Sequence, residues 1–323
     1  MAVWQILLAV VGILVGVIRF VYNFQAGRCK SQKKLEGKTV IVTGSSAGIG
    51  KSAAQDFARR GARVILACRN LEKAQRVADE IIKNSGNNHV VVRKLDTSDL
   101  SSVRQFANEI IKAEESLHIL VNNAGIAGEP KRKFTADGLE LTMATNYYGH
   151  FLLTNMLLKL LKKSAPSRII NVSSVMHNYC RKFDPEDLNF EKMSFGKIKV
   201  YSQSKLCNVL FTLELSEKLR GTGVTANSMN PGAVCTEILT KDNSVIGYVQ
   251  FVLFKLVGKD CDLGAQTIIY LAVSEDVDGV SGKYFEECKD SQCSKLGRHR
   301  GFAKKLWEAS ELDVKLQPEE VHY

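Results

Sequence analysis

The segment KTVIVTGSSAGIG, residues 38–50, joins a short apolar run to a turn with glycines at positions 44, 48 and 50. The β-branched residues of KTVIVT predict a buried strand over 38–43, and the following pattern predicts a helix from about Gly48. Glycine permits a tight turn and lets the backbone approach a pyrophosphate, which would meet the free amides at the positive end of that helix. The segment therefore predicts a dinucleotide-binding turn. Contacts with the dinucleotide are expected from Gly44, Ser45, Ser46, Ala47, Gly48, Ile49 and Gly50.

The alternation of apolar runs and helical patterns continues along the chain. Further strands are expected at 63–67, 89–95, 118–123, 168–174, 224–229 and 282–286. Repeated strand–helix units with apolar strands indicate a parallel sheet that helices cover on both faces. We therefore predict an α/β fold, a single Rossmann-type doubly wound domain over 38–290 with about seven parallel strands. Residues 291–323 are expected to form a C-terminal helical extension.

Composition narrows the class of protein. The chain has 323 residues, 45% of them hydrophobic and 24% charged, which suits one large buried core. Its net charge of +10 is spread along the chain without a nucleic-acid-binding motif, so no nucleic acid partner is expected. The eight cysteines include no Cys-x-x-Cys pair and no histidine partners at zinc spacing, which predicts free thiols and no metal site.

The first residues predict attachment to a membrane. Residues 2–22 form an apolar stretch of about the length that spans a hydrocarbon core, interrupted by Gln5 and Arg19. We expect a membrane anchor helix at 1–24 and a basic linker at 25–37. A cleaved secretory signal and a helix that enters one leaflet, with Arg19 reaching the surface, are the alternatives.

The flanking charges favour a retained anchor over a cleaved signal. No basic residue precedes the apolar stretch, whereas Arg28, Lys30, Lys33 and Lys34 follow it. By the positive-inside rule, the part of the chain that follows the apolar stretch should face the cytosol. We expect the membrane to be that of the endoplasmic reticulum. Membrane lipid is thus an expected partner, and lipidation of Cys29 is left open.

The second and third strands predict which nicotinamide cofactor is bound. The second strand ends in Cys68, Arg69 and Asn70, without an acidic residue to bind a ribose 2′-hydroxyl. Arg69 can instead pair with a 2′-phosphate, which favours NADP(H) over NAD; a surface arginine is the alternative. Asp96, just past the third strand, is expected to accept a hydrogen bond from the adenine amino group, or else to cap a helix.

Polar and small residues gather where the later strands end, at the edge of the sheet that binds ligands in such folds. Asn123, Ala124 and Gly125 follow the fourth strand, where small side chains let a cofactor pass closely. Asn146 lies within the next long helix, where asparagine has poor propensity and a specific role is plausible. Ser173 and Ser174 close the fifth strand.

Tyr201 and Lys205 supply the chemistry expected at this edge. Positions i and i+4 share one face of a helix, so the ammonium can lie near the phenol. A nearby cation favours phenolate and is expected to lower the tyrosine pKa from about 10 towards neutrality. A serine hydroxyl at the end of the fifth strand can donate to a developing alkoxide. The turn after the sixth strand, with Pro231, Gly232 and Thr236, is expected to lie along the nicotinamide.

Together these motifs resemble the short-chain dehydrogenase/reductase family over about residues 36–290. The shared features are TGxxxGxG at 43–50, NNAG at 122–125, Asn146, Ser174, YxxxK at 201–205 and NPG at 230–232. LACRN, YSQSKLCNVLF and SGKYFEECK are similar to the membrane-bound retinol dehydrogenase subgroup. The resemblance implies a catalytic tetrad of Asn146, Ser174, Tyr201 and Lys205.

The resemblance also implies a role for each member of the tetrad. Tyr201 would donate the proton to the carbonyl oxygen, and Ser174 would polarise that carbonyl. Lys205 would bind the nicotinamide ribose and lower the tyrosine pKa, and Asn146 would complete a proton relay through water. Two positions depart from the subgroup. Ala47 stands where many NADP-dependent relatives have a basic residue, and the turn reads SSAG where retinol dehydrogenases often have ANTG.

The substrate is expected to be apolar. VIGYVQFVLFKLV at 245–257 lies where the family builds its substrate lid, near 236–260, although a helix packed on the core is an equal alternative. We predict an NADP(H)-dependent oxidoreductase interconverting a lipophilic alcohol and its carbonyl, foremost retinol and retinaldehyde. A reductase of steroids or other lipid carbonyls is the alternative substrate class. A cofactor-binding membrane scaffold is the non-enzymatic alternative, and a homodimer is left open.

Overall fold

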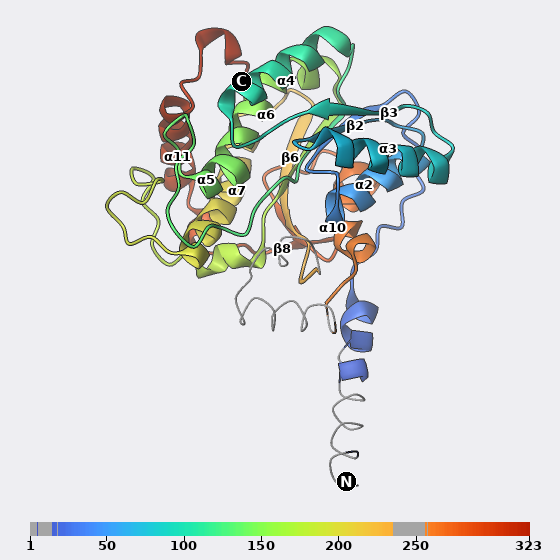
Figure 1. The fold of residues 1–323 in the computed structure, drawn as a ribbon, viewed down its shortest axis with the longest axis horizontal. Coiled ribbons are helices and arrows are strands. Elements are labelled where there is room, and N and C mark those ends of the chain that lie inside the picture. The colour runs from blue at the N-terminus through green and yellow to red at the C-terminus, as the bar shows by residue number, and fades with distance from the viewer. Residues whose placement is uncertain (1–4, 6–14, 18, 235–255, 257) are drawn as a thin grey trace.

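The computed structural model describes residues 5, 15–17, 19–234, 256 and 258–323 (Figure 1). These residues form one layered α/β unit around a single eight-stranded sheet with the strand order β3-β2-β1-β4-β5-β6-β7-β8. The strands are β1 Thr39–Thr43, β2 Arg63–Cys68, β3 Val90–Lys94, β4 Ile119–Asn122, β5 Ser167–Val172, β6 Val224–Asn230, β7 Tyr284–Glu286 and β8 Lys289–Ser291. The first seven strands run parallel, whereas β7 and β8 pair antiparallel.

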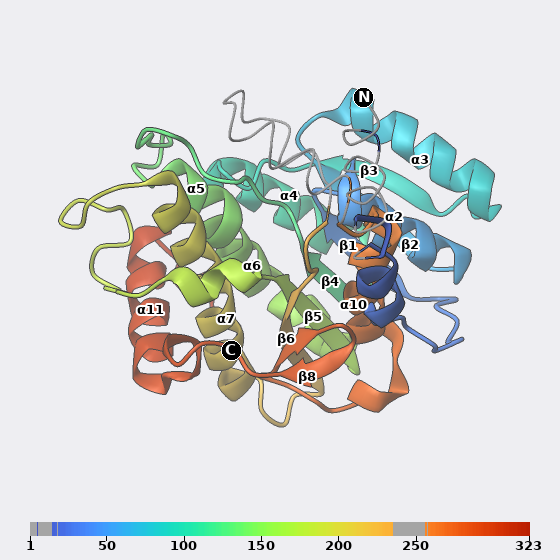
Figure 2. The ribbon, with the colours of Figure 1, turned by 90° about the horizontal axis from the view of Figure 1, so that it is seen from below.

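Helices cover both faces of the sheet (Figures 1 and 2). One face carries α2 (Gly48–Arg59), α3 (Leu71–Ser85) and α10 (Cys261–Val273). The other carries α4 (Leu100–Ala113), α5 (Leu141–Met143), α6 (Gly149–Lys163) and α7 (Lys197–Lys218), with α11 (Arg300–Asp313) packed on α7. Because side chains alternate along a strand, Ile41 enters one core while Val40 and Val42 enter the other. The predicted doubly wound arrangement is confirmed.

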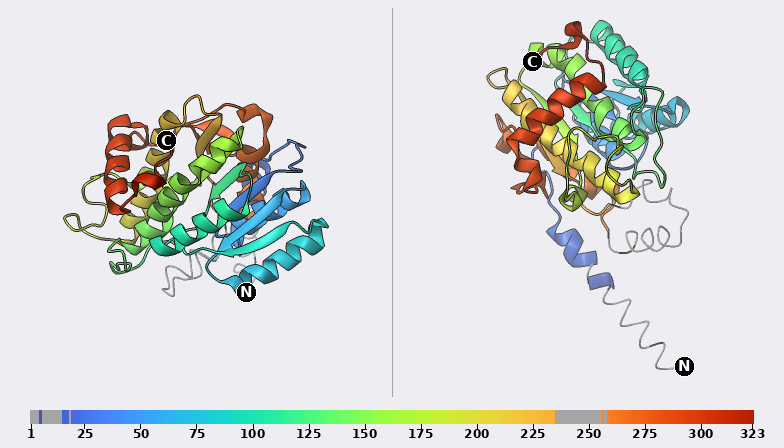
Figure 3. Two further views of the ribbon diagram at one scale, coloured as in Figure 1. Left: turned by 90° about the horizontal axis from the view of Figure 1, so that it is seen from above. Right: turned by 90° about the vertical axis from the view of Figure 1, so that its left-hand side faces the viewer.

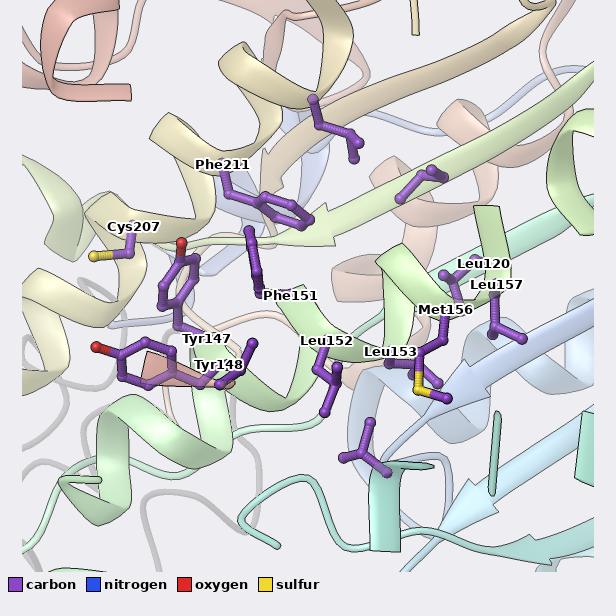
Figure 4. Packing of buried hydrophobic residues seen from close by; sticks show 14 of the residues in the cluster. Leu120, Tyr147, Tyr148, Phe151, Leu152, Leu153, Met156, Leu157, Cys207 and Phe211 are labelled. Atoms are coloured by element: carbon purple, nitrogen blue, oxygen red, sulfur yellow. The ribbon is translucent and has the colours of Figure 1, made fainter. Parts of the chain in front are cut away.

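An aromatic cluster fixes α7 against its neighbours (Figure 4). Tyr147, Phe151 and Phe211 lie close together, with Phe151 and Phe211 5.5 Å apart between ring centroids. Trp307 of α11 packs edge-on against Phe151 at 5.0 Å and stacks on Phe211 at 5.7 Å. Aromatic pairs at these separations add to the free energy of burial. The cluster therefore joins α6, α7 and α11 into the support that holds the middle of α7.

The sheet has one strand more than the sequence predicted. Strand β8 contains only Lys289, Asp290 and Ser291, and two of these three residues are exposed. It carries neither the apolar nor the β-branched pattern by which strands are predicted. The turn before it places Glu287 and Cys288 at positive φ, where glycine or asparagine is the usual sequence signal. Strand β8 could therefore not be predicted from the sequence pattern.

The N-terminal residues described are helical at 15–17 and 19–25; this end of the chain contacts the domain at Tyr22 and runs away from it towards residue 15 (Figure 3, right). Within the described part of the chain, every helix is too short or too polar to cross a bilayer. Most of the anchor predicted at 1–24 lies outside the described residues, so that anchor stays a prediction. Thr236 and nearly all of the predicted lid at 236–260 lie outside them too.

Candidate active site

The glycine turn lies between β1 and β4, where the strand order reverses and open α/β sheets bind ligands. Gly44 has φ +65°, and a Cβ there would lie 2.7 Å from Cα of Ala124. A Cβ on Gly50 would lie 2.5 Å from Nδ2 of Asn123. Close packing thus requires glycine at both positions, and at Gly44 the positive φ of the turn favours it as well. They bring the start of α2 directly against the segment that follows β4.

The start of α2 can accept an anion. Ala47 precedes the helix and has no side-chain acceptor to cap its amides, and the first turn contains no acidic residue. The amides and the positive end of the helix dipole are therefore free to meet a phosphate. Ser45 does not face this opening, because its buried hydroxyl donates to the Val42 carbonyl at 2.9 Å. Any cofactor contact of Ser45 must come from its backbone.

Thr43 and Asn123 join the two cofactor-binding segments. The Thr43 hydroxyl oxygen accepts from the backbone amides of Asn123 at 2.8 Å and Ala124 at 2.9 Å. The side-chain amide of Asn123 donates back to the Thr43 carbonyl at 2.8 Å. These reciprocal bonds fix the segment after β4 to the end of β1. The NNAG motif is therefore structural as well as a surface for the cofactor.

His150 connects this pair of segments to Asn146. Its Nε2 lies 2.9 Å from the Thr43 hydroxyl and its Nδ1 lies 3.2 Å from the Asn146 carbonyl oxygen. A carbonyl only accepts, so Nδ1 carries the proton and Nε2 accepts from Thr43. Burial lowers the pKa of His150 to about 4. Sequence reasoning missed His150 and the role of Thr43, although the four-residue spacing from Asn146 to His150 was a signal.

Asn146 lies in a π-helical turn over Ala144–Tyr148, a local break that often marks a functional site. Its side chain is fully engaged. Oδ1 accepts from the Ile126 amide at 2.8 Å, and Nδ2 donates to the Ile126 carbonyl and to Oγ of Ser204, each at 3.0 Å. The side-chain amide therefore holds the segment after NNAG. The main-chain carbonyl accepts from Nδ1 of His150 and has a second lone pair that can accept from a water.

The two serines that directly follow β5 differ in role. Ser173 is 2% exposed, and its hydroxyl donates to the Lys205 carbonyl at 2.7 Å, so it fastens β5 to α7. The Ser174 hydroxyl accepts from the Met176 amide at 3.2 Å and lies near enough to the Tyr201 phenol to lower its pKa. Only Ser174 thus faces Tyr201, in agreement with the residue that the sequence motif selected.

Tyr201 and Lys205 lie together on α7, but the pKa of Tyr201 shifts in the direction opposite to the sequence expectation. The Lys205 ammonium lies 5.7 Å from the centroid of the Tyr201 ring, is 4% exposed and donates to the Val172 carbonyl at 3.1 Å. Burial lowers the pKa of Lys205 to about 8. Burial also raises the pKa of Tyr201, and the hydrogen bond from Ser174 offsets only part of this rise. The predicted lowering of the phenol pKa is therefore wrong as a net shift.

Arg69 and Asp96 lie next to each other at the adenosine side of the expected cofactor site. The nearest nitrogen–oxygen distance between them is 3.8 Å, and the Arg69 side chain is 68% exposed. The other Asp96 oxygen accepts from the amide and the hydroxyl of Ser98. Asp99, not Asp96, caps α4. Arg69 is thus free to swing towards an added anion.

The turn after β6 contains the predicted nicotinamide-side residues. Gly232 has φ +82°, and its amide donates to the side-chain oxygen of Asn230 at 3.2 Å. Asn230 in turn donates to Glu286 of β7 at 3.2 Å. The turn is thereby fixed at the carboxyl edge of the sheet, on the same edge as Ser174.

Comparison with known proteins gives a consistent picture. The family model described as short chain dehydrogenase matches residues 38–184. Retinol dehydrogenase 11 of Homo sapiens is 45% identical over 285 residues, covering 88% of each chain. Retinol dehydrogenase 12 of Mus musculus is 44% identical over 287 residues, covering 89% of each chain. Retinol dehydrogenase 13 of Mus musculus is 44% identical and covers 94% of this chain and 91% of its own.

Solved structures share the fold over most of the chain. An uncharacterized protein from Mycobacterium paratuberculosis matches with a TM-score of 0.70 and 30% identity, covering 90% of this chain and 98% of its own. A short chain dehydrogenase from Escherichia coli, solved in complex with NADPH, matches with a TM-score of 0.60 and 25% identity, covering 80% of this chain and 99% of its own.

Proposed function

Because this chain belongs to the short-chain dehydrogenase family and is an oxidoreductase that uses a nicotinamide cofactor, we propose that it is an NADP(H)-dependent enzyme interconverting a lipophilic alcohol and its carbonyl. Retinol and retinaldehyde are the first substrates proposed, since relatives at 44–45% identity are named retinol dehydrogenases. The observation that carries the mechanism is the meeting of Ser174, Tyr201 and Lys205 at the carboxyl edge of the sheet, next to the glycine turn.

The described residues fit a nicotinamide dinucleotide. Gly44, Gly48 and the uncapped start of α2 would hold the pyrophosphate, and Arg69 would pair with the 2′-phosphate. Ala124 and Gly125 present little side-chain bulk next to Asn146 and Lys205. When bound, the cofactor supplies or accepts the hydride.

The protein's own residues would move the proton. In reduction, Tyr201 donates its phenolic proton to the carbonyl oxygen as negative charge develops, and the Ser174 hydroxyl donates a hydrogen bond to the same oxygen. The Lys205 ammonium favours the phenolate that remains. Its own pKa of about 8 lies close to neutral pH. We assign Asn146 to the path that returns a proton through water, with its main-chain carbonyl as the acceptor that would hold such a water.

The surface around the tetrad supports an apolar substrate. A short 3₁₀ helix, Val175–Tyr179, follows Ser174 directly; its first residue Val175 is 46% exposed and its last residue Tyr179 is 63% exposed. Ile198, on the face of α7 that also carries Tyr201, is 64% exposed. Exposed apolar side chains on both segments that carry the reacting residues favour a lipid-like carbonyl over a polar one. The same feature is compatible with a steroid, which is the second candidate.

The proposal includes attachment to the endoplasmic reticulum membrane, with the catalytic domain in the cytosol. Phe20 and Phe24 stack with ring centroids 5.9 Å apart and are 69% and 79% exposed, which suits contact with lipid. Carbonate extraction and protease protection of the full chain in microsomes test this part. Release by carbonate, or protection of the catalytic domain from added protease, would contradict it.

The test of function uses membranes that contain the recombinant full chain. NADPH oxidation is measured with retinaldehyde, a steroid ketone and an aliphatic aldehyde, and each reaction is repeated with NADH. We expect the highest kcat/KM with retinaldehyde and NADPH. A steroid that outperforms retinaldehyde would overturn the substrate, and equal rates with NADH would overturn the cofactor.

Arg69 is the residue on which the cofactor proposal depends. Loss of one exposed ion pair to the 2′-phosphate in Arg69→Ala should lower the NADPH-to-NADH preference about fivefold. Arg76, an exposed arginine of α3 that pairs with Glu72, provides the matched control in Arg76→Ala. An unchanged preference in Arg69→Ala would show that another group recognises the phosphate.

A further inference from the structure

The N-terminal segment directly contacts the turn that follows β6. The phenol oxygen of Tyr22 accepts from the Ala233 amide at 3.0 Å, across 211 positions of sequence. A Cβ built on Gly232 would lie 3.1 Å from that same phenol oxygen. The turn that contains Pro231 and Gly232 is therefore covered by a side chain from outside the catalytic domain.

Lys259 holds the same turn from another side. Its amide donates to the Ala233 carbonyl at 2.9 Å, so the amide and the carbonyl of Ala233 are bound by two different segments. Its side chain is 3% exposed, and its ammonium lies 5.6 Å from the centroid of the Tyr22 ring. The position of a Cβ on Gly232 is 3.1 Å from Nζ of Lys259. The phenol and the ammonium thus meet over the turn.

Glu287 closes this cluster of polar groups. One of its carboxylate oxygens pairs with the Lys259 ammonium, which compensates that buried charge. The other oxygen accepts from the Gly27 amide at 2.8 Å. A Cβ on Gly27 would lie 2.1 Å from the Glu287 carbonyl oxygen, so only glycine allows the segment to approach this closely. The N-terminal segment is therefore built into the domain at both Tyr22 and Gly27.

We propose that Tyr22 and Lys259 are positioning residues that fix the nicotinamide-side turn, and that the N-terminal segment is in this way part of the cofactor site. The inference rests on the proposed function for the role of this turn. It follows that seating of the N-terminal segment and binding of NADPH strengthen each other, because coupling between two binding events is reciprocal. The segment next to the membrane would then act on catalysis as well as on location.

Tyr22→Phe in the full chain tests the contact, since it removes only the hydroxyl. We expect faster hydrogen–deuterium exchange at the Ala233 amide and a three- to tenfold higher Kd for NADPH by nicotinamide fluorescence, the effect of about one neutral hydrogen bond. Once NADPH saturates the variant, kcat should return to within about twofold of wild type. A purely structural tyrosine would lower Tm without this separation of Kd from kcat.

Tyr323→Phe is the matched control, because it removes a phenol that donates to Glu311 far from the turn. It should leave both the exchange at Ala233 and the Kd for NADPH unchanged. Lys259→Met and Glu287→Gln, alone and together, form a second test: each should raise the Kd, and the double variant should raise it by less than the product of the two.

The outcomes separate this inference from the proposed function. Wild-type affinity for NADPH and wild-type exchange at Ala233 in Tyr22→Phe would overturn the inference even if carbonyl turnover is intact. Weaker NADPH binding in Tyr22→Phe would support it even if none of the tested carbonyls is reduced.

Discussion

The two halves of the candidate site are built in opposite ways. The cofactor half, around Gly44 and Gly50, consists of backbone and small side chains whose positions are set by close contact with Asn123 and Ala124. The catalytic half consists of polar side chains, with Lys205 and Asn146 almost completely buried. The function of the first half depends on the shape of the backbone, and that of the second depends on the protonation of its side chains. A substitution should therefore act on cofactor affinity in one half and on kcat or pH dependence in the other.

The largest effect is expected in the catalytic half. Tyr201→Phe removes the proposed proton donor and should lower kcat by about 10²–10⁴-fold, while NADPH binds with wild-type affinity. Single-turnover kinetics and a fluorescence titration of NADPH measure the two quantities separately. If Tyr201→Phe instead lost NADPH affinity and kept its kcat, Tyr201 would belong to the cofactor half and not to the catalytic half.

The two serines that directly follow β5 sharpen the comparison within the catalytic half. Ser174→Ala should lower kcat by about 10²-fold, because a donor to the developing alkoxide is lost. Ser173→Ala should leave kcat within a few fold and lower stability by about 1 kcal/mol, since its hydroxyl bonds only backbone. Steady-state kinetics and urea unfolding of both variants decide between them. Equal kinetic losses would contradict the assignment of Ser174.

His150 connects Thr43 of the cofactor half with Asn146 of the catalytic half and should make the stability of the folded protein depend on pH. Its pKa is about 4 in the folded protein and about 6.5 when unfolded. Between these values the unfolded chain binds more protons, so stability should fall as the pH drops from about 6.5 towards 4, by at most about 3 kcal/mol. Urea unfolding of wild type and His150→Gln over this range measures the effect.

In His150→Gln the pH dependence should be smaller, whereas the exposed His89 in His89→Gln should leave it as in wild type. An identical slope in wild type and His150→Gln would show that other groups, such as His177 or His118, whose pKa values burial also lowers, account for the acid sensitivity.

The smallest of these effects is expected in the cofactor half. Gly44→Ala combines backbone strain at positive φ with a contact of 2.7 Å to Ala124 and should raise the Kd for NADPH about tenfold or more. Gly138 also has positive φ but open space around it, so Gly138→Ala isolates the strain. Gly138→Ala should lower stability slightly and leave NADPH affinity unchanged. Equal NADPH affinities in the two variants would contradict the claim that close packing at Gly44 determines cofactor binding.

The same contrast explains what the sequence predicted. The glycine turn, the seven parallel strands and the Tyr201–Lys205 pair follow from local spacing, which fixes their geometry without knowledge of distant contacts. The roles of Thr43 and His150, and the difference between Ser173 and Ser174, depend on which atoms meet across the sheet. The sign of the Tyr201 shift depends on burial, which spacing does not report. The role of Tyr22 depends on a contact with Ala233, which lies 211 positions away in the sequence.

The most direct test of the central claim follows the hydride itself. The full chain is incubated with retinaldehyde and NADPH that carries deuterium at the transferring position of the nicotinamide, and the alcohol is analysed by mass spectrometry. We expect deuterium on the carbinol carbon with wild type and almost no product with Tyr201→Phe. Unlabelled retinol, or equal amounts of product from both proteins, would contradict the account.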